Sequence, residues 1–288
     1  MKHLLFKINL YLKLVRWDKP IGSLLLLWPT LWALWLASGG FPGWHLLAVF
    51  VLGTFLMRSA GCAVNDVADR HFDAHVARTA QRVVATGQVS VREALAVAAA
   101  CALVAGLLAL SLNAFARWLC LPAVAVAVVY PFCKRFFAVP QAVLGVAFSF
   151  GIPMAYAAVQ NALPAQMVWL FAANMAWVMA YDTAYAMADK PDDEKLGLRT
   201  SAIFFGQLDA WAVLAFEFVF IAIFAFILWH MGAAWPAWLG LTTGAAYAAY
   251  LMPAVFSRKR DACLKAFLAN SHVGLAVFLG LCASGSRG

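Results

Sequence analysis

Residues 43–73 read GWHLLAVFVLGTFLMRSAGCAVNDVADRHFD, an apolar run that ends in a cluster of acidic residues. A helix needs roughly 20 mostly apolar residues to cross a bilayer, and the run from 43 to 65 meets that length. Arg58 is the only Lys, Arg, Asp or Glu residue between positions 43 and 65. The stretch therefore predicts a membrane helix with carboxylates at one of its ends.

Similar apolar runs fill most of the chain. Of its 288 residues, 65% are hydrophobic and 12% are charged, whereas a soluble domain is about 25% charged. We therefore predict an all-α fold, a polytopic membrane bundle of nine transmembrane helices in a single domain, 1–288. Residues 1–20 mix apolar and basic side chains, which predicts an amphipathic lead-in at the membrane surface. The predicted spans are 21–38, 43–65, 92–112, 115–132, 138–159, 165–188, 207–229, 235–256 and 265–284.

The basic residues are distributed unevenly among the loops. Most of the 21 Lys and Arg residues lie in the N-terminal segment or in the loops after the second, fourth, sixth and eighth predicted spans. The positive-inside rule then places the N-terminus in the cytoplasm and the C-terminus outside. This topology accounts for the net charge of +8, so the charge does not indicate a nucleic-acid partner. The predicted environment is the lipid bilayer.

The first acidic cluster follows the span 43–65. Asn65, Asp69 and Asp73 are four residues apart, so on a helix they form one stripe, with Asp66 beside it. Ionisable groups at a membrane helix end are costly and usually functional. Oxygen ligands at this density suit Mg²⁺, which takes one or two carboxylates together with substrate phosphate and water. The alternative is a solvated loop patch, which a single spacing of this kind does not exclude.

The second acidic cluster lies at the end of the span 165–188. Asp182, Asp189 and Asp193 share one face if the helix persists, but Pro191 leaves a loop as the alternative for the last turn. The alternation of the spans brings both clusters to the same membrane face. Two oxygen-rich stripes on one face predict a two-metal clamp on a diphosphate.

Basic side chains stand next to the acidic clusters. Arg78 and Arg82 follow the first cluster and are candidates to bind diphosphate oxygens and stabilise the leaving group. For these two residues and for Lys134, a pure topology signal is the alternative. Arg58 lies seven residues before Asn65, so it shares that face about two turns deeper. Its guanidinium would either pair with an acidic cluster or bind a substrate carboxylate, for which its planar fork is suited.

The two acidic motifs together resemble those of the UbiA superfamily of membrane prenyltransferases. Residues 65–73 match the family's N-D-x-x-D-x-x-x-D, and residues 181–193 match its Y-D-T-x-Y-A-x-x-D-x-x-D-D. Supporting stretches include DKPIGSLLLLWPTLWALW from Asp18 and YPFCKR from Tyr130. The likeness covers nearly the whole chain. It is strongest to the members that prenylate 4-hydroxybenzoate with a polyprenyl diphosphate.

The resemblance implies a central cavity, open laterally to lipid beneath cytoplasmic cap loops, with Mg²⁺ as the cofactor. It further implies attachment of a polyprenyl group to 4-hydroxybenzoate in ubiquinone biosynthesis. The residues that it assigns to the Mg²⁺-diphosphate site, as catalytic groups and metal ligands, are Asn65, Asp69, Asp73, Asp189 and Asp193. The residues expected to bind substrate also include Asn65, Asp66 and Asp182. Of the others, Arg78, Arg82 and Lys134 are expected to contact the diphosphate, and Arg58 and Tyr130 to lie near the aromatic acid.

The sequence departs from the family pattern at one place, and two alternative functions are considered. The family usually has Arg-Pro-Leu after the first motif, where this chain has Arg82-Val83-Val84, so we expect a less rigid loop. A related prenyltransferase that acts on a naphthoate, homogentisate or haem is one alternative. A divalent-cation transporter is the other. It predicts acidic residues near the middle of the bilayer and inverted repeats, whereas these clusters are predicted at one face.

Overall fold

The computed structural model describes residues 2–76 and 78–285, except for the side chains of residues 2–4 and 134. This part of the chain contains helices and no β-strand, which confirms the predicted all-α fold. The elements are α1 (Lys2–Leu14), α2 (Ile21–Ser38), α3 (Trp44–Ala68), α4 (Arg70–Asp73), α5 (Val91–Ala109), α6 (Ala114–Val129), η1 (Tyr130–Arg135), α7 (Pro140–Ser149), α8 (Gly151–Gln160), α9 (Ala165–Lys195), α10 (Ser201–Phe205), η2 (Gly206–Leu208), α11 (Asp209–His230), α12 (Trp235–Phe256) and α13 (Arg260–Ala283).

Eight stretches within the described residues are long and apolar enough to cross a membrane. They correspond to eight of the nine predicted spans, with ends that differ by a few residues. The remaining predicted span, 165–188, lies in α9, which is not one of these eight stretches. It is less apolar than they are because Gln166, Asn174 and Asp182 interrupt its hydrophobic residues. The fold is therefore a polytopic membrane bundle, for which nine is an approximate helix count.

The predicted span 138–159 is divided into α7 and α8. Pro153 has no N–H to donate to the carbonyl of Ser149, so the helical hydrogen-bond ladder is interrupted at Phe150. Gly151 follows the break, and a Cβ at this position would overlap Oγ1 of Thr30. The glycine therefore allows the start of α8 to pack closely against α2.

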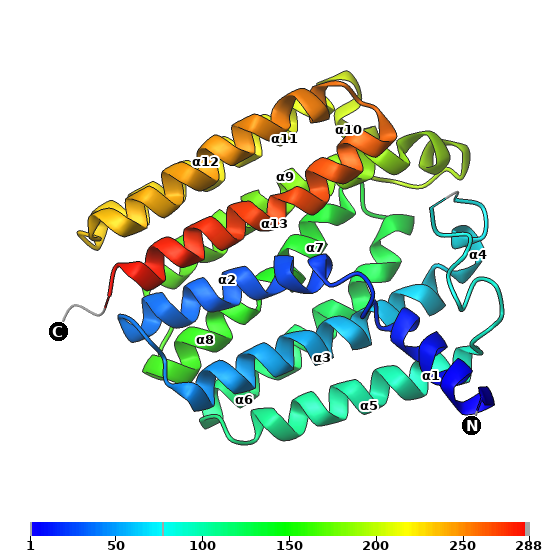
Figure 1. Cartoon of the computed structure of the whole chain (residues 1–288), viewed down its shortest axis with the longest axis horizontal. Coiled ribbons are helices and arrows are strands. Elements are labelled where there is room, and N and C mark those ends of the chain that lie inside the picture. Colours follow the sequence, from blue (N-terminus) through cyan, green and yellow to red (C-terminus); the bar gives the residue numbers. More distant parts are fainter. Residues whose placement is uncertain (1, 77, 286–288) are drawn as a thin grey trace.

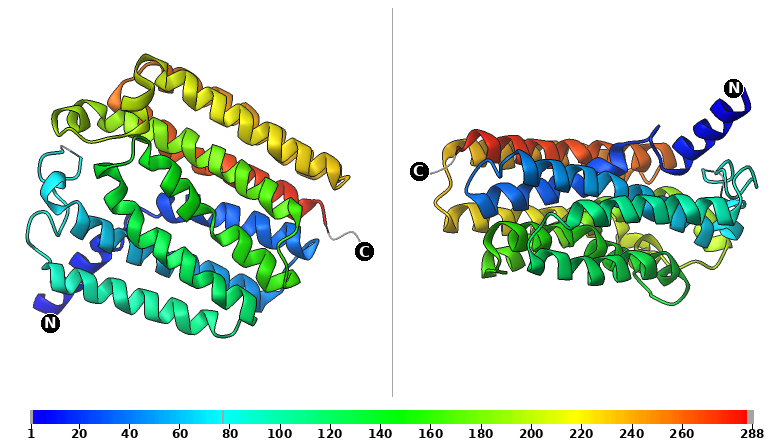
Figure 2. Two further views of the ribbon diagram at one scale, coloured as in Figure 1. Left: turned by 180° about the vertical axis from the view of Figure 1, so that it is seen from behind. Right: turned by 90° about the horizontal axis from the view of Figure 1, so that it is seen from below.

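The long helices lie nearly parallel to one another, with their ends gathered at two opposite sides (Figure 1). α1, α4 and α10 lie at one end of the bundle, and the last turn of α13 lies at the other. α1 projects obliquely from the bundle (Figure 2) and exposes Leu5, Phe6 and Leu12. The acidic segment after α3 and the charged end of α9 therefore share one end of the molecule.

Aromatic side chains fill the core between α2, α9 and α11. The ring centroids of Trp32 and Trp177 lie 5.1 Å apart, and Trp32 packs edge to face on Phe224 at 5.4 Å. All three side chains are fully buried. Gly240 and Gly280 have no side chains, so the backbones of α12 and α13 come into contact on the outer side of the bundle. The aromatic packing around Trp177 fixes the rotation of α9 about its axis, and with it the face that carries the second acidic cluster.

A buried carboxylate anchors the charged end of α9 from behind. Asp209, at the start of α11, is 1% exposed and accepts hydrogen bonds from Lys190 Nζ at 3.0 Å and Arg258 Nε at 2.7 Å. Asp192 accepts a hydrogen bond from Arg260 at 2.8 Å. These ion pairs join α9 to α11 and to the start of α13, and they join α11 to the loop between α12 and α13.

Asp209→Ala should lower the thermal unfolding midpoint of the purified protein. Removing one partner of a fully buried ion pair costs about 3–5 kcal/mol. Arg258 is 42% exposed and can turn to water, so we expect a smaller loss in the free energy of unfolding, about 2 kcal/mol. Asp261→Ala removes an exposed carboxylate from the same end and is the control. Equal midpoints for the two variants would contradict the anchoring role.

Candidate active site

One cavity of about 990 Å³ lies among α2, α3, α5, α6, α7, α8, α9 and α13, and no described residue of α11 or α12 lines it. Every predicted site residue whose side chain is described lines this cavity. The prediction for Lys134 falls on a side chain outside the described part of the structure. The residues brought together are Arg58, Asn65, Asp66, Asp69, Asp73, Arg78, Arg82, Tyr130, Asp182, Asp189 and Asp193.

The first acidic cluster keeps its stripe although the helix is interrupted. α3 ends at Ala68 and α4 begins at Arg70. The backbone N–H of Asp69 nevertheless donates to the carbonyl of Asn65 at 2.8 Å, and that of Asp73 donates to the carbonyl of Asp69 at 2.8 Å. Asn65 Nδ2 also donates to Asp69 Oδ2 at 3.2 Å. Helical spacing is therefore retained, and all three side chains of the stripe line the cavity.

Arginines pair with two carboxylates of the first acidic cluster, Asp66 and Asp73. Arg16, between α1 and α2, donates to Asp66 Oδ1 at 2.6 Å. Arg82 lies 3.2 Å from the same Asp66 oxygen and 2.8 Å from Asp73 Oδ2. Burial raises the pKa of Asp73, and the charge of Arg82 opposes that rise. Arg16 was not among the predicted site residues, and its place in the basic N-terminal lead-in was the only sequence signal for it.

The second acidic cluster stays helical beyond Pro191. α9 continues without interruption from Ala165 to Lys195. Asp182, Asp189 and Asp193 accordingly lie on the face that lines the cavity. The structure thus excludes the loop that was the alternative for this last turn.

Arg78 links the two clusters. Its Nε donates to Asp189 Oδ1 at 3.1 Å, and its Cζ lies 4.5 Å from the centroid of the Tyr185 ring. Burial alone would lower the pKa of Arg78, but Tyr185 and Asp189 outweigh burial, and the pKa is raised. Arg78 follows the first cluster and Asp189 belongs to the second, so the two motifs meet across one cavity.

The oxygen donors of this site fit Mg²⁺ bound together with a phosphate ligand. Within residues 2–76 and 78–285, no three Asp, Glu, His or Cys side chains converge closely enough to hold a metal ion by themselves. Mg²⁺ does not require such a cage, because it usually keeps several waters and binds one or two carboxylates plus substrate phosphates. Carboxylates of that kind line the cavity from two sides, Asp69 and Asp73 on one and Asp189 and Asp193 on the other.

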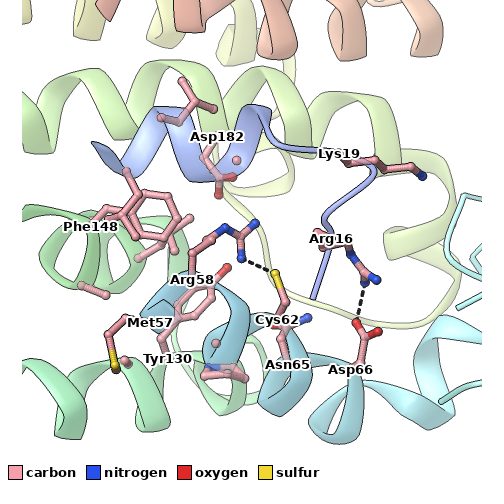
Figure 3. Close-up of a pocket in the computed structure, with 18 of the residues that line it drawn as sticks. Arg16, Lys19, Met57, Arg58, Cys62, Asn65, Asp66, Tyr130, Phe148 and Asp182 are labelled. Atoms are coloured by element: carbon pink, nitrogen blue, oxygen red, sulfur yellow. Dashed lines mark hydrogen bonds and ion pairs between the residues drawn. The ribbon is translucent and has the colours of Figure 1, made fainter. Parts of the chain in front are cut away.

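Arg58 lies between Tyr130 and Asp182 in the cavity (Figure 3). Its Nη1 donates to Sγ of Cys62 at 2.8 Å, and its Cζ lies 5.9 Å from the centroid of the Phe148 ring. Its Nε is buried and has no hydrogen-bond partner among the atoms that the structure describes. An unpaired guanidinium nitrogen is costly to bury, so this position favours an anionic ligand.

Comparison with known proteins identifies the family of this chain. The sequence profile of the UbiA prenyltransferase family matches residues 26–278. A 4-hydroxybenzoate octaprenyltransferase from Paracidovorax citrulli is 55% identical over 277 residues, which are 96% of this chain and 94% of that protein. A UbiA homolog from Aeropyrum pernix K1 has a similar structure, with a TM-score of 0.76 at 24% identity over 91% of this chain and 98% of that one. A UbiA homolog from Archaeoglobus fulgidus bound to GPP and Mg²⁺ gives 0.66 at 17% identity, over 95% of this chain and 99% of that one. The chain therefore belongs to the UbiA prenyltransferase family.

Proposed function

We propose that this protein transfers a polyprenyl group from a polyprenyl diphosphate to 4-hydroxybenzoate, giving 3-polyprenyl-4-hydroxybenzoate in ubiquinone biosynthesis. The observation that carries the proposal is the meeting of two acidic motifs, through Arg78 and Asp189, in a cavity that also holds the half-buried Arg58. The name of the Paracidovorax citrulli relative supports this acceptor and an octaprenyl donor.

The acidic end of the cavity is the proposed diphosphate site. When bound there, Mg²⁺ supplies positive charge to the diphosphate oxygens and stabilises the leaving group. Asn65 would contribute an amide oxygen, and the four aspartates of the two stripes would contribute carboxylates. The proposed ligands are Asn65, Asp69, Asp73, Asp189 and Asp193.

Arg78 and Arg82 are proposed to exchange partners when the diphosphate binds. In the structure, Asp189 holds Arg78 and Asp73 holds Arg82. Both carboxylates are proposed metal ligands, so their attraction for the arginines weakens once they share a cation. The guanidinium donors then become available to diphosphate oxygens. Lys134 of η1 is proposed to bind the same anion.

The proposed reaction replaces a C–O bond by a C–C bond. The bond between C1 of the prenyl group and the diphosphate breaks, and the electron pair leaves with the diphosphate. The ring carbon ortho to the hydroxyl of 4-hydroxybenzoate attacks the allylic cation and then loses its proton. Leu144, Phe148 and other apolar side chains line the cavity. They would keep water from the cation, while the charged residues stabilise the leaving group.

We further infer that the diphosphate site faces the cytoplasm, in the bacterial inner membrane. The N-terminal helix and the segments that follow α3 and α9 lie at the same end of the bundle (Figure 1). Most of the 21 Lys and Arg residues lie in the N-terminal segment or close to the C-terminal ends of α3, α6, α9 and α12. The positive-inside rule supports a cytoplasmic location for these segments.

Arg58→Ala should raise the KM for 4-hydroxybenzoate and leave the KM for the prenyl diphosphate nearly unchanged. A hydrogen bond to a charged group contributes about 1.5–3 kcal/mol, which corresponds to a roughly 10- to 100-fold rise. Arg70→Ala is the control, because Arg70 donates to the carbonyl of Val67 and does not line the cavity. Initial rates measure both constants. An unchanged KM for the acid would remove Arg58 from the acceptor site.

Mass spectrometry of reaction products tests the proposed function directly. Purified protein is given Mg²⁺, octaprenyl and shorter prenyl diphosphates, and either 4-hydroxybenzoate, a naphthoate or homogentisate. We expect a prenylated 4-hydroxybenzoate whose mass increases with the donor. Product from another acceptor alone would replace the proposed substrate. Metal flux into liposomes in the absence of prenyl substrate, without any product, would favour a transporter instead.

A further inference from the structure

The cavity follows α3 far beyond the charged end of the bundle. Residues about one turn apart on this helix line it without a gap: Asn65, Gly61, Met57, Gly53 and Val49. From residue 49 to residue 65 the helix rises by about 24 Å. Val49 lies in the second turn of α3, so the cavity reaches nearly to the end of the bundle that lies opposite the acidic clusters.

The deeper part of the cavity, which we call the apolar arm, lies between α3, α5 and α6. It is lined by residues of α3 between 49 and 57, of α5 between 102 and 112, and of α6 between 120 and 127. None of the described residues that line the arm is charged. The arm therefore offers no binding group for a diphosphate, but a hydrocarbon chain attached to a diphosphate can extend along it among apolar side chains.

Two glycines keep space free in the wall of the arm. A Cβ added to Gly53 on α3, or to Gly106 on α5, would meet no described atom within 4 Å. Both residues line the cavity, so open space lies where any other residue would place a side chain. Glycine within a helix is less stable than alanine. The wall is thus widened at two positions where an ordinary helix residue would narrow it.

The arm reaches the outer surface of the bundle between α5 and α6. Gly106 and Val124 line the cavity and are also exposed. Leu107 and Leu121, next in the sequence to the lining faces of these helices, are exposed as well, so this surface is suited to lipid. α5 packs mainly against α3, and α6 packs mainly against α8. The weak packing between α5 and α6 leaves a lateral opening at Gly106 and Val124.

We propose that the apolar arm binds the prenyl tail of the donor, that the tail enters the lipid between α5 and α6, and that Gly53 sets the tolerance for long donors. The identity of the donor rests on the proposed function. Gly53 lies 12 residues before Asn65 in α3, or about 18 Å deeper. A geranyl group held by its diphosphate at the acidic end stops short of Gly53, whereas an octaprenyl group extends past it.

A different opening offers the tail a shorter path. Leu268 of α13 lines the cavity and is exposed. It lies in the third turn of α13, which begins beside the charged end of α9, where Arg260 donates to Asp192. A tail that left the protein there would leave the apolar arm empty. The length of the arm, its uncharged wall and its two glycines favour the path between α5 and α6.

Calorimetry with unreactive thiolo analogues, in which sulfur replaces the oxygen between C1 and the diphosphate, tests the role of Gly53 without the reaction. Gly53→Leu should bind the octaprenyl analogue at least about tenfold more weakly than the wild type, because the leucine fills space that the tail needs. Its affinity for the geranyl analogue should stay within about twofold. Ala48→Leu is the matched control, since Ala48 is exposed on α3 and does not line the cavity. Equal losses for both analogues, or no loss for the octaprenyl analogue, would overturn the proposal.

Variants at the two openings locate the exit of the tail. Gly106→Leu should weaken binding of the octaprenyl analogue at least about fivefold and leave the geranyl analogue within about twofold. Leu268→Trp should change neither affinity by more than about twofold. A loss for the octaprenyl analogue in Leu268→Trp as large as that in Gly106→Leu would overturn the path between α5 and α6.

Thermal unfolding midpoints show whether each variant is folded. Replacing a helical glycine by leucine improves helix propensity, so Gly53→Leu and Gly106→Leu should unfold no lower than the wild type. Gly53→Ala places one carbon in the open space and should show the same selectivity between analogues to a smaller degree. It takes the place of Gly53→Leu if the leucine variant is unfolded, and an octaprenyl affinity equal to that of the wild type would then refute the role of Gly53.

Product formation separates this inference from the proposed function. With 4-hydroxybenzoate as acceptor, Gly53→Leu should keep kcat/KM for geranyl diphosphate within about twofold of the wild type and lower that for octaprenyl diphosphate at least about tenfold. If binding depends on tail length as expected but the wild type forms no prenylated acid, the proposed function fails and the path of the tail stands. If the wild type forms product and Gly53→Leu uses both donors equally well, only the role of Gly53 fails.

Discussion

Asp189→Ala and Asp69→Ala should each lower the rate of prenyl transfer by about 10³-fold or more, with the fold retained. The two carboxylates approach the cavity from different helices, Asp69 at the end of α3 and Asp189 on α9. Loss of either one leaves the diphosphate held from one side only, so less charge is stabilised as the C–O bond breaks. The rate is measured with labelled prenyl diphosphate at saturating Mg²⁺ and saturating concentrations of both substrates.

Glu194→Ala is the matched control for the two aspartate variants. Glu194 lies at the same end of α9, but it is exposed and does not line the cavity. Its replacement should leave turnover within about twofold of the wild type, as for most surface substitutions. Thermal unfolding midpoints show whether each variant is folded. Near-normal turnover in either folded aspartate variant would refute the proposed clamp.

Residue spacing was sufficient to predict which carboxylates share a face. The spacing of Asn65, Asp69 and Asp73 depends only on helical periodicity, and it survives the interruption between α3 and α4. Pro191 marks the limit of this reasoning. A proline in a helix removes one hydrogen bond, and whether the next turn continues depends on the packing around it. Here Lys190 and Asp192 tie that turn to neighbouring elements, and α9 remains helical.

The ion pairs across the cavity could not be predicted from spacing. Arg16 and Asp66 are 50 residues apart, and Arg78 and Asp189 are 111 residues apart. Such pairs depend on how the helices pack, which a single sequence does not specify. Their meeting in one cavity makes a joint site physically possible, and the roles of the individual residues stay predictions until variants are measured.

The charge balance of the cavity bears directly on metal dependence. At its acidic end, six carboxylates face five basic side chains: Asp18, Asp66, Asp69, Asp73, Asp189 and Asp193 against Lys13, Arg16, Lys19, Arg78 and Arg82. A diphosphate adds further negative charge, and like charges at contact distance repel strongly in a poorly hydrated cavity. The acceptor is instead proposed to bind Arg58, about two turns away from Asn65 along α3. The two substrates should therefore differ in their need for a divalent cation.

Excess EDTA should reduce prenyl transfer to the background rate, and added Mg²⁺ should restore it. In excess EDTA, an unreactive thiolo analogue of a prenyl diphosphate should bind at least about tenfold more weakly than it does with Mg²⁺, because the carboxylates repel it when no cation is bound. Benzoate has the carboxylate of the acceptor and lacks its hydroxyl. Its affinity should change by less than about twofold, since the proposed contact with Arg58 lies away from the stripe. Calorimetric titrations of both ligands, with and without Mg²⁺, measure these effects. Turnover that persists in excess chelator would contradict the metal clamp, and an equal loss for both ligands would place the acid at the diphosphate end instead of at Arg58.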